Sequence, residues 1–158
     1  MPPTPSTTPL TVTIGFYSYA DNNNSTQIYY PQSLGYPTPH NAASGDGSYN
    51  NPITMGGAKS VFSPGTKLYV YALNKYVVME DYCSVCENDW SWSQKRTIQI
   101  WIGGDGTSSA ASLASCSATL TGFISQSNYA GLILPNPPST GLAVNTTPLF
   151  NTASSVCY

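Results

Sequence analysis

Alternation of apolar and polar residues predicts several short β-strands in this chain. Residues 10–19 read LTVTIGFYSY, in which apolar side chains alternate with threonine or glycine. Residues 67–81 read KLYVYALNKYVVMED, two β-rich runs that flank Leu73 and Asn74, and this pattern indicates a hairpin. Residues 96–104 read RTIQIWIGG and place three isoleucines on one face. These segments predict a protein built mainly from strands.

The rest of the chain shows little helical periodicity. Residues 109–116, SAASLASC, predict one short helix, and residues 117–126, SATLTGFISQ, predict a further strand. Residues 131–150 form short extended pieces broken by proline. Residues 22–51 read as one long loop, a length that is uncommon in a compact domain unless the loop is functional. Many short strands with many turns are typical of an all-β barrel or sandwich.

The chain length predicts a single domain over residues 10–158. Residues 1–9, MPPTPSTTP, are predicted to be a disordered Pro/Thr-rich leader. This segment lacks the basic start and apolar centre of a signal peptide. We therefore interpret Met1 as the start of a mature chain.

Charged residues make up only 8% of the chain, and the formal net charge is −2. So little charge gives no long-range attraction for phosphates or anionic lipids, and nucleic acids and membranes are not expected partners. The four cysteines are an even number, and glycosylation sequons begin at Asn23, Asn24 and Asn145. These features together predict a secreted, extracellular glycoprotein with disulfide bonds.

Three sequence segments follow one another in this order along the chain: FSPGTKLYV, KYVVMEDYC and TIQIWIGG. Together they resemble the core of double-psi β-barrels over roughly residues 53–104. In particular they resemble the bacterial three-aspartate domain of lytic transglycosylases and cell-wall hydrolases; expansins, barwin-like proteins and family-45 endoglucanases share the barrel. The resemblance implies an all-β fold, a six-stranded double-psi β-barrel with long loops and little helix.

The whole chain also resembles a group of small secreted fungal proteins. The shared elements are HNA…GSYNNPIT, which begins at His40, and the terminal TTPLF…C. This second resemblance supports secretion and implies no particular activity.

The first resemblance implies which residues lie at the ancestral aspartates. Asp81 matches the central aspartate, Gln99 stands at the position of the general acid, and the first aspartate falls near Ala58, where the chain has no acid. An amide donates and accepts hydrogen bonds but cannot deliver a proton. The resemblance therefore favours a barrel that binds a glycan without cleaving it.

A hydrolase that uses Asp81 is the alternative, and it needs a second carboxylate. Glu80 cannot supply it, because consecutive strand residues point to opposite faces, whereas glycosidases hold two carboxyls at a defined separation. The candidate partners are Asp46, Asp89 and Asp105. In the simpler interpretation, Asp81 only accepts backbone hydrogen bonds where its strand ends.

Cys83 and Cys86 have the spacing of a redox dithiol or of half a zinc site. A thioredoxin-type dithiol needs a helix N-terminus, and residues 83–92 read as an acidic loop after a strand. We therefore expect all four cysteines to form structural disulfides, with Cys83 and Cys86 each tied to a distant segment at Cys116 or Cys157. The sequence leaves three pairings open.

Such crosslinks would preorganise residues 83–92 as a binding surface. If this segment is extended, Trp90 and Trp92 lie on one side and can form a stacking platform for sugars with Trp101. Asp89 and Gln99 would then bind hydroxyl groups. In the alternative interpretation, the tryptophans plug one end of the barrel.

The long loop contributes a second set of candidate ligand-binding residues. The set comprises His40, Asn41, Asp46 and Tyr49. His40 is the only histidine, and no cysteine is expected to be free, so the chain offers too few ligands for a transition-metal site. No metal or cofactor is expected. A loop histidine that bonds the backbone is the simpler interpretation.

These observations predict a secreted glycan-binding β-barrel whose partner is a cell-wall or surface carbohydrate. The alternative is a polysaccharide-cleaving hydrolase or lytic enzyme that uses Asp81 with a second carboxylate, for which Asp89 is the first candidate. Whether the protein is an enzyme stays open, and the sequence predicts no oligomeric state.

Overall fold

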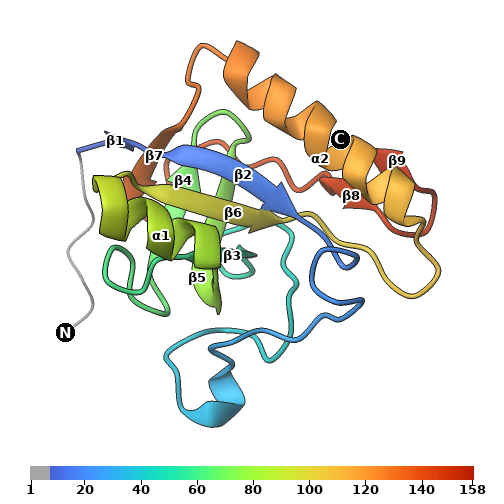
Figure 1. The fold of residues 1–158 in the computed structure, drawn as a ribbon. Coiled ribbons are helices and arrows are strands. Elements are labelled where there is room, and N and C mark those ends of the chain that lie inside the picture. The colour runs from blue at the N-terminus through green and yellow to red at the C-terminus, as the bar shows by residue number, and fades with distance from the viewer. Residues whose placement is uncertain (1–7) are drawn as a thin grey trace.

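A computed structural model describes residues 8–158, so residues 1–7 of the predicted leader lie outside the described part (Figure 1). The main sheet contains seven strands, β1 (Leu10–Thr11), β2 (Thr13–Tyr17), β3 (Ile53–Gly57), β4 (Lys67–Val70), β5 (Lys75–Tyr82), β6 (Thr97–Trp101) and β7 (Leu132–Pro135). The other elements are the 3-10 helix η1 (Gln32–Leu34), the helices α1 (Ser84–Ser93) and α2 (Ala110–Gln126), and a small sheet of β8 (Phe150–Asn151) and β9 (Val156–Cys157).

The main sheet curls into a nearly closed barrel. Its strand order is β1-β7-β4-β5-β3-β6-β2, and the two outermost strands are consecutive in the chain, separated only by Val12. β2 runs parallel to β6 and β3 runs parallel to β5, whereas the other neighbours are antiparallel. The prediction of a mainly-β barrel is confirmed. The sheet has seven strands rather than six, because the first predicted strand is divided at Val12.

Apolar side chains from the central strands fill the barrel. Met55 of β3, Val77 and Met79 of β5, and Ile98 and Ile100 of β6 have no exposed surface and belong to one core cluster. Their alternation along each strand matches the period of two that the sequence shows. Burial of such side chains contributes roughly 1.5–3 kcal/mol each.

Helix α2 covers one side of the barrel and packs against β2 (Figure 1). Ser109 caps it, because its side chain accepts a hydrogen bond from the Ser112 N–H at 3.2 Å. The predicted strand over residues 117–126 is wrong, since these residues continue the helix. The buried residues follow helical spacing: Leu113, Cys116, Leu120 and Ile124.

Residues 83–92 were predicted to be a loop, and this prediction is also wrong. Helix α1 begins directly after Cys83, whose Sγ accepts a hydrogen bond from the Cys86 N–H at 3.1 Å. It ends at Ser93, and the C-cap residue Gln94 has left-handed backbone angles. The segment lacks a continuous apolar stripe, so the periodicity that usually marks a helix is absent from the sequence.

All four cysteines form disulfides, as predicted, but the expected long-range pairing of the close cysteines is wrong. The bonds join Cys83 to Cys86 and Cys116 to Cys157. The turn that opens α1 brings the Cα atoms of Cys83 and Cys86 within 5.2 Å, which suits a disulfide. Cys116, on α2, holds β9 near the C-terminus instead.

Candidate functional site

An irregularity in the sheet brings Asp81 and Gln99 to one place. The parallel pairing of β3 with β5 shifts between Met55 and Gly56, so that Gly56 lies opposite Asp81 rather than Glu80. On its other side, Gly56 lies opposite Gln99 of β6. Bulges of this kind redirect a side chain relative to the regular alternation. Asp81 and Gln99 therefore flank a glycine that places no side chain between them.

Three donors hold the Asp81 carboxyl. The Tyr17 hydroxyl donates to Oδ2 at 2.8 Å, and the backbone N–H groups of Tyr29 and Tyr82 both donate to Oδ1 at 2.9 Å. Asp81 is only 6% exposed. Burial raises the pKa of Asp81, although the three hydrogen bonds act in the opposite direction. The site thus holds a carboxyl in a fixed orientation and with a perturbed pKa, a combination that is common at functional sites.

Two adjoining hollows open at Asp81, with volumes of about 330 and about 270 Å³. They share Asp81, Asn22 and Asn23. The larger hollow is also lined by Tyr17, Asp21, Gly56, Tyr82, Cys83, Ser84 and Gln99. The smaller one is also lined by Ser25, Gln27, Ile28 and Tyr29. We refer to both together as the Asp81 pocket, and most of its lining side chains offer neutral hydrogen-bonding groups.

Two exposed tyrosines border the Asp81 pocket. Tyr29 is 65% exposed and Tyr82 is 49% exposed, and their ring centroids lie 5.3 Å apart. Tyr29 lines the smaller hollow and Tyr82 the larger one. Large aromatic side chains left in water beside a polar hollow are typical of ligand-binding surfaces.

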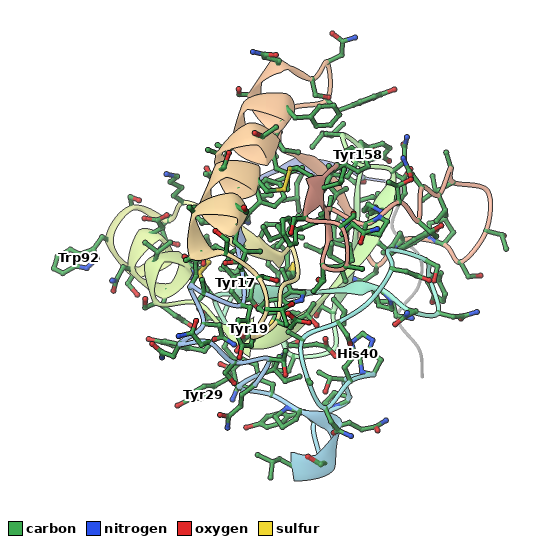
Figure 2. All side chains as sticks on the ribbon, turned by 90° about the vertical axis from the view of Figure 1, so that its right-hand side faces the viewer. Tyr17, Tyr19, Tyr29, His40, Trp92 and Tyr158 are labelled. Carbon is green, nitrogen blue, oxygen red and sulfur yellow. A yellow bond between two sulfur atoms is a disulfide. The ribbon has the colours of Figure 1, made fainter. Side chains whose placement is uncertain are left out.

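The predicted platform of three tryptophans does not form. Trp101 is buried and packs edge-on against Tyr17, and half-buried Trp90 lies against Arg96 and the Cys83–Cys86 cluster. Trp92 is 87% exposed and points away from the body of the molecule (Figure 2). In a helix, residues two positions apart project in widely different directions, so the premise that Trp90 and Trp92 share a side is wrong. The aromatic groups beside the pocket are tyrosines.

Glu80 lies in a separate, closed cluster. Its carboxylate has no exposed surface and accepts hydrogen bonds from His40 Nδ1 at 2.8 Å, from the His40 backbone N–H at 3.0 Å and from Thr54 Oγ1 at 2.6 Å. His40 Nε2 lies 2.8 Å from Asn51 Oδ1. The hydrogen bond to Glu80 raises the pKa of His40, and partial burial opposes this effect. The cluster fastens the long loop to β5.

The other predicted loop residues lie outside the Asp81 pocket. Asn41 Oδ1 accepts from the Ser33 N–H at 2.7 Å, and Asp46 Oδ1 accepts from the Ser48 N–H at 2.9 Å. Tyr49 packs edge-on against another tyrosine near the start of β5. The contacts of Asn41 and Asp46 thus lie within the loop, whereas His40 and Tyr49 attach the loop to β5.

The acids of α1 also serve the fold. Asp89 Oδ2 accepts from Thr97 Oγ1 at 2.6 Å, and Glu87 Oε1 accepts from the Lys59 N–H at 2.8 Å. Asp89 thus ties α1 to β6 and does not line the pocket with Asp81. Asp105 closes its own turn by accepting hydrogen bonds from Thr107.

Asp21 is a pocket residue that sequence reasoning missed. It lines the larger hollow with Asp81, and its Oδ2 accepts from the Ser18 N–H at 3.0 Å and from Ser18 Oγ at 3.1 Å. The sequence feature that could have identified Asp21 is its position just after the predicted strand 10–19, in the segment SYADNNN. Residues that directly follow a strand often belong to loops that hold binding or catalytic side chains.

Within residues 8–158, no group of three or more His, Cys, Asp or Glu side chains is arranged to hold a metal ion. In the same range, no helix has both the length and the apolar character to cross a membrane.

Comparisons with known proteins identify relatives by sequence. No solved structure matches the chain. The Dictyostelium discoideum protein named Uncharacterized protein DDB_G0273701/DDB_G0273221 is 36% identical over 144 residues, which cover 90% of this chain. The chain spans 57% of the length of that relative, which comes from a slime mould rather than from a fungus. A family model matches residues 9–158, and the chain therefore belongs to the family described as the DDB_G0273701 N-terminal domain.

Proposed function

We propose that this protein binds a carbohydrate, and that a sugar ring occupies the Asp81 pocket. The observation that carries the proposal is that a hydrogen-bonded carboxyl, a side-chain amide and two exposed tyrosines lie together at the Asp81 pocket. Gln99 and Tyr82 line its larger hollow, Tyr29 lines its smaller hollow, and Asp81 lines both.

The side chains that line the pocket can bind both the hydroxyl groups and the flat C–H face of a sugar. Sugar hydroxyls both donate and accept hydrogen bonds, and so do the amides of Gln99, Asn22 and Asn23. The flat C–H face of a sugar ring packs on an aromatic ring, and the rings of Tyr29 and Tyr82 are tilted by only 39° to each other. A net charge of −2 gives no preference for strongly anionic ligands.

We also infer the finer type of the barrel and its cellular compartment. If β1 and β2 are counted as one strand divided at Val12, six strands remain, and two of their pairings are parallel. This count supports the double-psi barrel that the sequence resemblance implies. Two disulfides support a secreted protein, because such bonds persist in oxidising compartments.

One observation favours hydrolysis as a second candidate function. Asp21 and Asp81 line the same hollow, so two carboxyl groups border one potential ligand site. In that reaction, Asp81 would act as the acid because burial raises its pKa, and Asp21 would act on the opposite side. Gln99 has no proton-transfer role in this scheme.

Binding to an array of chitin, glucan, cellulose and peptidoglycan fragments tests the proposal. We expect Tyr29→Ala to weaken binding about tenfold, which corresponds to roughly 1.4 kcal/mol from loss of one stacked ring. Trp92→Ala is the matched control, since it removes an exposed aromatic side chain that lines neither hollow.

Equal affinities for the wild type, Tyr29→Ala and Trp92→Ala would overturn the proposed site. Product release in the same assays that disappears in both Asp21→Asn and Asp81→Asn would favour the hydrolase instead. Binding without product release that is weakened in Tyr29→Ala and unchanged in Trp92→Ala supports the binding function.

A further inference from the structure

The Cys83–Cys86 disulfide has surroundings that set it apart from an ordinary structural crosslink. It spans the N-terminus of α1, a helix of ten residues, with Cys83 at the N-cap and Cys86 in the first turn. The Cys86 N–H points at Cys83 Sγ over 3.1 Å. The N-terminus of a helix stabilises negative charge, including the charge of a thiolate.

One cysteine of this disulfide lines the Asp81 pocket, and the other is fully buried. Cys83 lines the larger hollow of the Asp81 pocket, next to Ser84 and Gly56. Cys86 has no exposed surface, and its Sγ faces the Gly56 carbonyl oxygen at 3.9 Å. The two cysteines are therefore unequal, since Cys83 is 4% exposed and lines the hollow, whereas Cys86 is not among its lining residues.

The second disulfide provides an internal contrast. Cys116 and Cys157 are 41 positions apart, whereas Cys83 and Cys86 are separated by 3. In the chain-entropy description, a crosslink stabilises the fold less when it closes a shorter loop. Opening the short bond releases no distant segment, because α1 remains tied to the barrel through Asp89 and Glu87.

We propose that the Cys83–Cys86 disulfide is exchangeable, and that it oxidises low-molecular-weight thiols that enter the Asp81 pocket. This activity is separate from the proposed glycan binding and does not depend on it. The reactants are two thiol molecules and the protein disulfide, and the products are one small disulfide and a protein dithiol.

The exchange proceeds in two displacements. The first thiolate attacks Cys83 Sγ, the Cys83–Cys86 bond breaks, and the electron pair leaves on Cys86 Sγ, which takes up a proton and faces the Gly56 carbonyl. A second thiolate then attacks the external sulfur of the mixed disulfide and expels the Cys83 thiolate. The Cys86 N–H stabilises that thiolate, which is then protonated from solvent. Two electrons and two protons pass from the two thiols to the protein.

Incubation of the folded protein in buffers of graded glutathione to glutathione-disulfide ratio, followed by alkylation and peptide mass mapping, tests the proposal. We expect Cys83 and Cys86 to become alkylated at a ratio at which Cys116 and Cys157 stay paired. Exposure alone predicts the reverse order, since Cys157 is only partly buried. Opening of the Cys116–Cys157 bond first, or of neither bond before the chain unfolds, would overturn the proposal.

Trapping of the mixed disulfide identifies the attacked sulfur. With glutathione disulfide as the probe, Cys86→Ser should be glutathionylated at Cys83 at least about tenfold faster than Cys83→Ser is at Cys86, because only Cys83 borders the hollow. Equal rates would contradict the assignment. If either variant fails to fold, the alkylation order in the wild type still decides. Both assays contain no glycan, so their failure leaves the binding proposal untouched.

Discussion

Glu80 and Asp81 are consecutive residues of β5, and both side chains are shielded from water, but they meet very different surroundings. The Glu80 carboxylate is closed in by three donors from His40 and Thr54. The Asp81 carboxyl also has three donors, yet it borders two open hollows. The long loop contributes one partner to each acid, His40 to Glu80 and Tyr29 to Asp81.

This difference separates a structural acid from a candidate functional one. Burial alone does not distinguish the two residues, and neither does the number of their hydrogen bonds. What distinguishes them is free space, because a ligand can reach only Asp81. A shift of one residue in the β3–β5 pairing produces that difference, since it places Asp81 rather than Glu80 beside Gly56.

Among the substitutions at these two acids, Glu80→Ala is expected to have the largest effect on stability. The substitution leaves the donors of His40 and Thr54 buried without an acceptor, so the free energy of unfolding should fall by about 3 kcal/mol. Urea denaturation measures this loss. Glu80→Gln keeps one acceptor oxygen and should lose about half as much. A loss below about 1 kcal/mol in Glu80→Ala would show that the cluster does not stabilise the loop.

The pH dependence of stability tests the same cluster with a smaller effect. The hydrogen bond to Glu80 raises the pKa of His40, so the folded state binds this proton more tightly than the unfolded state does. The stabilisation is therefore fully present below about pH 6.5, the unfolded pKa, and is lost as the pH rises through the higher folded pKa. Denaturation midpoints should fall over this window in the wild type and stay level in His40→Gln. A wild-type midpoint that is constant there would contradict the prediction.

The sequence alone predicts the strands of this fold better than its helices. The strands at β2, β4, β5 and β6 were predicted because barrel filling enforces an alternation of period two that local sequence displays. The helices were mostly missed: α1 carries no apolar stripe, and the second half of α2 is rich in β-formers such as Thr119, Thr121 and Ile124. Burial against β2 overrides that local preference.

The site was predictable only in part, for a related reason. The resemblance singled out Asp81 and Gln99 as site candidates, and in the structure both residues line one hollow. Asp21 and Tyr29 join them through a long loop whose path depends on contacts with β5, such as the Tyr29 N–H bond to Asp81. Long-range contacts of this kind leave no periodic signal. The pairing of Cys83 with Cys86 was missed because it follows from the unrecognised helix α1.

Asp81→Asn is expected to have the smallest effect on stability and to weaken ligand binding. The asparagine Oδ1 can still accept from the Tyr29 and Tyr82 N–H groups, and its Nδ2 can donate to the Tyr17 hydroxyl oxygen. Burial raises the pKa of Asp81, so the stability that this residue contributes is present below the unfolded pKa of about 3.9 and is lost as the pH rises through the folded value.

At neutral pH the substitution should therefore change the free energy of unfolding by no more than about 1 kcal/mol, and stabilisation is the expected direction. It should also flatten the dependence of stability on pH in the acidic range, which denaturation from about pH 3 to pH 7 would show. Glycan binding should weaken in the same variant, because an amide replaces the charged acceptor in the pocket. A large loss of stability with unchanged binding would reverse the assignment and make Asp81 a structural acid like Glu80.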